Sequence, residues 1–260
     1  MRKVYGDRKM KGRHHQIRQY CAHHDIWYLK IPLDIPREII KEVHDVYENG
    51  FFVEHRYGDT AETGGWKSAA IHSWVEKGTS QYMGWYHTMN PSGHGCTEED
   101  AVWGWTEVAD YAPEMKRWLT DRFPNKGYRR CRFMLLEPER VIEAHHDSNA
   151  KRDAEGRTRT IASAINIAIT QPKGCYLRRA DTKEELPFEE CTGYWFDNGV
   201  VHEAYNGSKE NRFHFIIHGG ANEARYELML HALKELIGND VERDLENFSR
   251  WTGPYENSRN

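Results

Sequence analysis

Residues 193–218 read GYWFDNGVVHEAYNGSKENRFHFIIH, and this stretch decides the fold. It contains three short runs rich in β-branched and aromatic residues, which are typical of strands. These runs span 193–197, 200–205 and 212–218. Asp, Asn, Gly and Ser residues fill the gaps between the runs, and such residues favour turns. The stretch therefore predicts consecutive strands joined by polar turns, with no helix between them.

The same pattern extends towards the N-terminus as far as residue 129. Four further runs of this kind span 129–136, 141–144, 159–170 and 174–179. Many short strands without intervening helices indicate a β-sandwich or barrel. We therefore expect an α+β chain whose core, residues 129–219, is mainly β.

The rest of the chain is predicted to be richer in helix. A run at 26–31 predicts a strand, and Pro36 opens a helix whose apolar residues recur at helical spacing until Asn49 and Gly50 end it. The polar tail at 239–260 predicts no element. The other expected elements are a short strand at 67–72, two helices within 98–123 that are divided at Pro113 and bury Trp103, and a last helix at 222–237.

Length and composition indicate one globular domain. The chain has 260 residues, of which 38% are hydrophobic and nine are tryptophan, and this is enough to bury a full core. We divide this single domain, residues 1–260, into four consecutive parts. They are a basic N-terminal arm at 1–24, a helix-rich part at 25–128, the β core at 129–219, and a C-terminal helix and tail at 220–260.

Cysteine content and charge exclude several classes of protein. Five cysteines are scattered without a CxxC pair, which argues against a disulfide framework or a zinc ribbon and favours reduced thiols in the cytoplasm. We find no apolar stretch that fits a membrane span and no signal sequence. The net charge of −4 gives no general attraction to nucleic acid. Only residues 1–18 are strongly basic, and we expect a solvated tail there.

Three residues of the β core have the types and spacing of a metal site. His145 and Asp147 are separated by one residue on a predicted strand, so their side chains point to one face while that of His146 points away. His202, on a later strand, supplies a third ligand. Two imidazoles and one carboxylate leave open positions on an octahedral ion, as in non-haem iron(II) oxygenases. We therefore expect Fe(II) at this place.

The same tripeptide occurs a second time and provides an internal control. His23, His24 and Asp25 lie between the basic arm and the first predicted strand, outside the β core. No other feature of a metal site accompanies them. We therefore interpret them as incidental surface residues.

Arg212 suggests that an anion binds near the metal. It lies ten residues after His202 and inside the apolar run RFHFII. A guanidinium in such a strand needs an anion to compensate for its burial, and a dicarboxylate chelated at the metal supplies one. His214 shares a face with Arg212 and is expected to line the same pocket.

These features together resemble a known family. The matching residues are RFMLLEPERVIEAHHD (132–147), INIAITQPKGC (165–175) and GYWFDNGVVHEAYNGSKENRFHFI (193–216). They resemble the catalytic core of the aspartyl/asparaginyl β-hydroxylase family of Fe(II)- and 2-oxoglutarate-dependent dioxygenases, which also includes bacterial proline hydroxylases. The resemblance implies a double-stranded β-helix, or jelly-roll, with the metal between two facing sheets. It also implies that Arg212 binds the distal carboxylate of 2-oxoglutarate.

The chain departs from the family at Asn166, where relatives commonly have a histidine. An amide still donates a hydrogen bond to a carboxylate but cannot carry charge, so the resemblance implies altered contacts with the co-substrate there. Trp195 is expected to line the metal site and exclude water. Asp197 and Asn198 are expected to build the turn before His202.

The resemblance implies a single catalytic domain that hydroxylates a free amino acid, or an amino-acid side chain in a peptide or protein, with O2. Asp147 fills the position that halogenating relatives leave open, which favours hydroxylation. Neither a membrane nor nucleic acid is an expected partner. Two alternatives remain open. One is a cupin-like metal enzyme that does not use 2-oxoglutarate, and the other is a metal-stabilised binding module without turnover.

Overall fold

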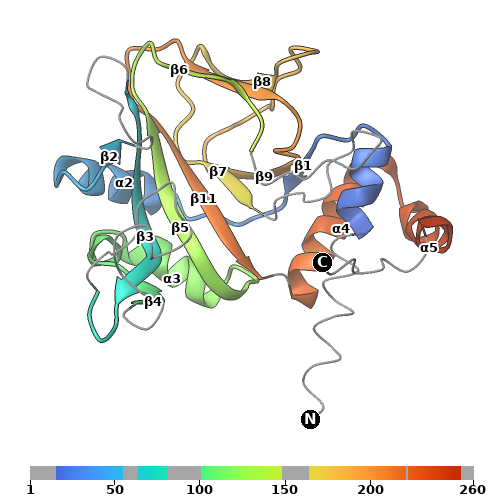
Figure 1. The fold of residues 1–260 in the computed structure, drawn as a ribbon, viewed down its shortest axis with the longest axis horizontal. Helices are drawn as coiled ribbons and strands as arrows, with labels where there is room; N and C mark the ends of the chain where they lie inside the picture. The colour runs from blue at the N-terminus through green and yellow to red at the C-terminus, as the bar shows by residue number, and fades with distance from the viewer. Residues whose placement is uncertain (1–15, 55–63, 81–100, 148–163, 221, 253–260) are drawn as a thin grey trace.

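The described strands form two sheets that face each other (Figure 1). This computed structural model describes residues 16–54, 64–80, 101–147, 164–220 and 222–252. In spatial order the large sheet comprises β1 (Tyr28–Ile31), β9 (Thr192–Phe196), β7 (Ile165–Ala168), β11 (Arg212–Gly220), β5 (Lys126–Leu136), β3 (Trp66–Glu76) and β2 (Val53–Glu54), with β4 (Ala101–Trp105) also paired to β3. The small sheet comprises β6 (Val141–His145), β10 (His202–Asn206) and β8 (Cys175–Arg179).

Strand β11 shows how the large sheet divides its side chains between two faces. Phe213 and Phe215 are fully buried on one face, and Arg212 and His214 project from the other. Cross-strand pairing extends this division across the sheet. We call the side that carries Arg212, His214, Ile216 and their cross-strand partners the inner face, because it looks towards the small sheet.

The opposite face packs against helices and holds the main hydrophobic core. Helix α2 (Glu38–Glu48) buries Ile39, Val43 and Val46, whose spacing places them on one side of the helix. The helix stops at Asn49, and Gly50 takes the positive φ of 76° that this ending requires. Helices α3 (Pro113–Asp121) and α4 (Glu223–Ile237) contribute Met115, Leu119, Met229 and Leu233 to the same core.

A second apolar cluster lies between the two sheets. Phe188 and Tyr194 pack there, with Leu177 of β8 partly buried against them. The other members are Trp27, Ala168, Leu186 and Phe196. Two facing sheets with an apolar filling form a jelly-roll, so the predicted fold class, an α+β chain with a mainly β double-stranded β-helix core, is confirmed.

The segment 98–123 differs from its prediction. Residues 101–105 form strand β4, which pairs antiparallel with β3, and only α3 is an α-helix. The composition AVWGW suits extended chain, and pairing gives Trp103 a stacked partner in Trp74, with ring centroids 4.3 Å apart. Trp103 is accordingly half-buried on the sheet and does not enter the helical core.

Two helices lie where the sequence predicts none. Residues 16–23, expected to belong to the basic arm, are helical, and the tail contains α5 (Val241–Thr252). Each helix buries only a few apolar residues one turn apart, and its other positions are mostly polar or charged, so the helical period is weak in the sequence. The buried apolar residues are Ile17, Tyr20, Cys21, Val241 and Leu245.

Candidate metal centre

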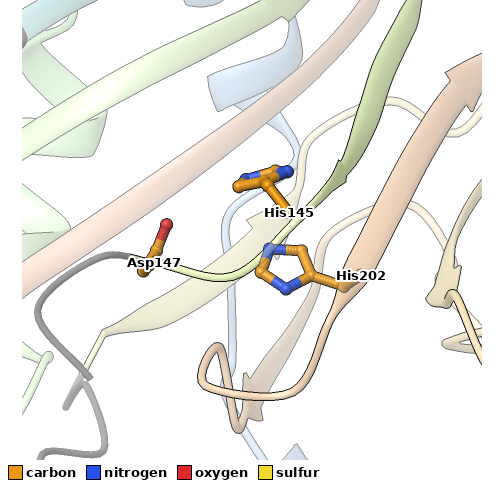
Figure 2. Close-up of side chains that lie close together, drawn as sticks. All are labelled: His145, Asp147 and His202. Atoms are coloured by element: carbon orange, nitrogen blue, oxygen red, sulfur yellow. The ribbon is translucent and has the colours of Figure 1, made fainter. Parts of the chain in front are cut away.

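The small sheet brings the three predicted metal ligands together. His145 ends β6 and His202 begins β10, and the two are direct partners in the antiparallel pairing. Asp147 lies just beyond the strand, two residues after His145. One candidate ligand atom from each side chain lies within 4.8 Å of the other two (Figure 2). Among the described residues, no other group of at least three His, Cys, Asp or Glu side chains meets this criterion.

Both imidazoles are oriented by backbone carbonyl groups. His145 Nδ1 lies 2.7 Å from the carbonyl oxygen of Glu143, and His202 Nδ1 lies 2.8 Å from that of Val200. A carbonyl oxygen only accepts, so each Nδ1 carries the proton and donates it. With Nδ1 as the donor, Nε2 is the ring nitrogen of each histidine that is left for a metal, which is the usual arrangement of metal-binding histidines.

Asn198 holds the carboxylate ligand. The backbone N–H of Asp147 donates to the carbonyl oxygen of Asn198 at 3.0 Å, and the side-chain amide of Asn198 donates to Asp147 Oδ2. Asp147 is exposed and lies outside strand β6, so no strand pairing of β6 fixes its side chain. The two hydrogen bonds define where this carboxylate lies.

The surroundings of the histidines are aromatic. Phe196 meets the ring of His202 edge to face at 5.2 Å, and the ring of Trp66 lies 6.2 Å from that of His145. Burial lowers the pKa of His202, and the neighbouring His145 lowers it further. His202 is therefore kept in the neutral form that binds metal.

Arg212 is buried on the inner face without a carboxylate partner among the described residues. Its Nε donates to Gln171 Oε1 at 3.1 Å and its Nη1 donates to the carbonyl oxygen of Tyr176 at 3.3 Å. Burial lowers the pKa of Arg212 to about 10. Its Nη2 is buried and has no hydrogen-bond partner in the described part of the chain. A guanidinium with an unused, buried N–H group is a receptor for an anion.

His214 and Asn166 lie on the same inner face as Arg212. His214 is the next inner-face residue of β11, and its Nε2 is also buried and unpartnered within the described residues. Burial, and then the charge of Arg212, hold the pKa of His214 well below its usual value, so the ring is neutral. Asn166 is buried on β7 opposite Ile216. Phe188 packs against both side chains, with its ring centroid 4.7 Å from that of His214 and 5.8 Å from the Arg212 guanidinium carbon.

Trp195 does not line the metal site, contrary to the prediction. It is fully buried in the main core on the helix side of β9, opposite Leu29 of β1. Its neighbours Tyr194 and Phe196 occupy the inner cluster instead. Side chains alternate along a strand, so a shift of one residue in the assumed orientation reverses every assignment.

The N-terminal copy of the tripeptide is not part of any described metal group. Asp25 Oδ1 accepts a hydrogen bond from Arg179 Nη1 at 2.7 Å, and Arg179 also pairs with Asp181. His23 and His24 are exposed. The two histidines thus lie on the surface, as expected, whereas Asp25 has a structural role in holding Arg179.

Sequence reasoning missed four residues that the structure places around the site. Asn198 was expected only to shape a turn, and its contact with Asp147 joins residues 51 positions apart, which no local pattern reveals. Gln171 lies inside the family-matching stretch 165–175, so the resemblance could have indicated that it is near the site. Trp66 and Phe188 lie outside all matching motifs.

The donor set fits iron(II). Two imidazole nitrogens and one carboxylate oxygen provide three ligands and leave the remaining octahedral positions open. The buried, unpartnered Arg212 Nη2 fits the distal carboxylate of a keto acid, because it offers a charged donor on the inner face, which looks towards the small sheet. The residues present thus fit both the metal and a dicarboxylate co-substrate.

Several solved structures resemble this chain at low sequence identity. An oxidoreductase of the 2-oxoglutarate-Fe(II) oxygenase family from Burkholderia pseudomallei is 10% identical, with 82% of this chain and 92% of that one covered and a TM-score of 0.42. A prolyl-4-hydroxylase from Pseudomonas putida is 12% identical, with coverages of 75% and 93% and a TM-score of 0.39. A Trichoplax adhaerens prolyl hydroxylase, solved with a peptide fragment of hypoxia inducible factor, is 12% identical, with coverages of 88% and 97% and a TM-score of 0.40.

The sequence itself matches a family model. The aspartyl/asparaginyl β-hydroxylase model covers residues 36–219, which is more than two thirds of the chain. No curated protein matches the sequence. The matched range contains His145, Asp147, His202 and Arg212. The chain therefore belongs to the aspartyl/asparaginyl β-hydroxylase family.

Proposed function

We propose that the chain hydroxylates an amino acid, free or within a peptide, with His145, Asp147 and His202 as the Fe(II) ligands and Arg212 as the anchor of 2-oxoglutarate. The observation that carries this proposal is the buried Nη2 of Arg212, which has no partner within the described residues. A histidine–carboxylate metal group occurs in many metalloenzymes. A buried, charged donor on the inner face of the facing sheet favours an enzyme that also binds a dicarboxylate.

Iron(II) held by these residues supplies the redox chemistry that couples the oxidative decarboxylation of 2-oxoglutarate by O2 to hydroxylation of the substrate, with succinate and CO2 as the other products. The protein provides orientation. Val200 and Glu143 fix the two imidazole rings, and Asn198 fixes the carboxylate. No general base is required for this reaction, and none is assigned.

Arg212 and its neighbours provide the binding of the co-substrate. Arg212 Nη2 donates to the distal carboxylate, and His214, neutral at physiological pH, offers its Nε2 to the same group. Phe188 and the burial of the pocket exclude water, which strengthens this charged hydrogen bond. Asn166 contributes an uncharged amide from the neighbouring strand β7.

The inner face also favours a substrate that carries a carboxylate. Arg132 of β5 is only 6% exposed and lies opposite Ile216, the inner-face residue that follows His214 on β11. A buried arginine at this position makes the pocket beyond the co-substrate positively charged. This charge favours a substrate that presents either the carboxylate of a free amino acid or an acidic side chain.

We also propose that the enzyme works in the cytoplasm. The four described cysteines, Cys21, Cys131, Cys175 and Cys191, are free thiols, which supports a reducing compartment. No helix in the part of the chain that the structure describes has both the length and the apolar character to cross a membrane.

Turnover tests the proposed function directly. The protein is loaded with Fe(II) without oxygen, given 2-oxoglutarate and O2, and incubated with a panel of free amino acids and acidic or proline-containing peptides. We expect one member to raise succinate formation above the uncoupled background and to gain one oxygen atom by mass spectrometry. If no member does so, the substrate class is wrong. If no succinate forms at all, even uncoupled, 2-oxoglutarate chemistry is wrong and a cupin-like enzyme or a binding module replaces it.

A further inference from the structure

One turn supports two of the three metal ligands. Residues 197–201 connect β9 to β10, and the turn is closed by hydrogen bonds from Gly199 N to Asp197 Oδ1 at 2.9 Å and from Val200 N to the Asp197 carbonyl oxygen at 3.1 Å. The Asp197 N–H donates to the carbonyl oxygen of Trp27 at 2.8 Å, which ties the turn to the large sheet. At the other end the carbonyl oxygen of Val201 accepts from the Ala180 N–H at 2.9 Å, so the turn is a platform held by backbone hydrogen bonds at both of its ends.

The platform contacts the two ligands in different ways. His202 donates from Nδ1 to the carbonyl oxygen of Val200, a contact that any residue at position 200 provides. Asp147 is held by the side chain of Asn198 in addition to its backbone. His145 depends on Glu143 of its own strand and is independent of the turn. Only the Asp147 carboxylate thus relies on the identity of one side chain in the turn.

Asp147 needs such support more than the histidines do. His202 is buried and half-buried His145 ends a paired strand, whereas Asp147 is exposed and follows the strand end. An exposed carboxylate samples several rotamers, and metal binding must then restrict it. A donor that fixes the carboxylate before the metal arrives removes that entropic cost.

We propose that Asn198 is a positioning residue, which orients the Asp147 carboxylate towards the two imidazoles before iron binds. The side chain of Asn198 is suited to this task, because its Nδ2 donates to the carboxylate while the backbone carbonyl oxygen of the same residue accepts from the Asp147 N–H. The two contacts together form a closed ring between the residues. This inference rests on the proposed metal site, and it adds a residue that does not touch the metal.

Metal affinity is the test, measured by calorimetry with Co(II) under anaerobic conditions. We expect Asn198→Ala to weaken Co(II) binding roughly 10- to 100-fold, the effect typical of removing a group that orients a metal ligand. The visible absorption of bound Co(II) should also change, which a loss of general stability does not cause. Asn49→Ala is the matched control, because Asn49 Nδ2 donates to a backbone carbonyl at 2.8 Å on the surface, at the end of α2.

A double-mutant cycle isolates the contact. If Asn198 acts through Asp147, Asn198→Ala has no further effect on Co(II) affinity in an Asp147→Ala background. Equal melting temperatures of the metal-free proteins show that the fold is intact, and Asn198→Ser, which keeps a small polar residue in the turn but shortens the donor, should weaken binding in the same direction. Unchanged affinity in both Asn198 variants, or an equal loss in the Asp147→Ala background, overturns the proposal. Unchanged affinity of Asp147→Ala itself overturns the metal site instead.

Discussion

Replacement of Arg212 by methionine tests the co-substrate pocket most directly. Methionine has a similar length and no charge, so it fills the space without the donor. A charge-assisted hydrogen bond contributes about 1.5–3 kcal/mol, and the unpartnered Nη2 is the group that offers one. We therefore expect the affinity for 2-oxoglutarate to fall roughly 10- to 150-fold in Arg212→Met.

The same change should alter stability little. Burial lowers the pKa of Arg212 to about 10, so the charged form is disfavoured in the folded protein by about 3 kcal/mol. Removing the side chain relieves this cost but also breaks two hydrogen bonds, to Gln171 at 3.1 Å and to Tyr176 at 3.3 Å, which are long and therefore contribute about 1.5 kcal/mol each, the lower end for a charged donor. The two effects are similar in size and opposite in sign. The melting temperature of the metal-free variant should therefore remain close to that of the wild type.

Calorimetric titration of the Mn(II)-loaded protein with 2-oxoglutarate provides the assay. 2-Oxobutyrate serves as a second ligand, because it keeps the keto acid but lacks the distal carboxylate, and its affinity should be the same in both proteins. Arg178→Met is the control, since this partly exposed arginine pairs with Glu203 at 2.7 Å and is not on the pocket side of β8. The reasoning is refuted if Arg212→Met binds 2-oxoglutarate within about twofold of the wild type, or if it loses 2-oxobutyrate equally.

Three further predictions address stability, pH and substrate. Glu42 accepts from the backbone N–H groups of Glu114 and Met115 at the start of α3, so Glu42→Ala should lower the free energy of unfolding in urea by about 1–3 kcal/mol and leave Co(II) affinity unchanged. Burial lowers the pKa of His214. Below the ordinary pKa of 6.5, the unfolded chain therefore binds a proton at this residue and the folded chain does not. As the pH falls further, the free energy of unfolding decreases by up to about 1.4 kcal/mol per pH unit. His214→Gln should flatten that slope between pH 6.5 and 5, and an unchanged slope contradicts the assignment. Arg132→Gln should raise KM for the carboxylate-bearing substrate without changing KM for 2-oxoglutarate, and equal changes in both exclude a role in substrate binding.

The β core was predictable because its pattern is local. Runs such as 212–218 alternate between core residues and inner-face residues, and polar turn residues bound them, so strand positions follow from the sequence. The ligand pair His145 and Asp147 follows from the same period of two. His202 and Arg212 could be added because they lie on neighbouring runs in a recognisable order.

The features that the sequence did not predict correctly depend on tertiary contacts. Strand β4 is defined by its pairing with β3, and five residues alone do not distinguish a short strand from a helix turn. Trp195 was assigned to the wrong face, because a fully apolar run such as that of β9 gives no sign of which side is inward. The Asn198 contact crosses 51 residues of sequence and becomes visible only when β6 and β10 pair.

The division of the site between two sheets has a consequence for which keto acids fit. The histidine ligands belong to the small sheet, and Asp147 lies just past its strand β6, whereas Arg212 belongs to the large sheet. Facing sheets are held about 10 Å apart by the side chains between them, here Phe188, Tyr194 and their neighbours. The packing of these aromatic residues therefore sets the length of a molecule that touches both sides. If Arg212 anchors the distal carboxylate as proposed, we expect a keto diacid one methylene shorter or longer than 2-oxoglutarate to reach only one of its two anchors, so that the thickness of the core selects the co-substrate.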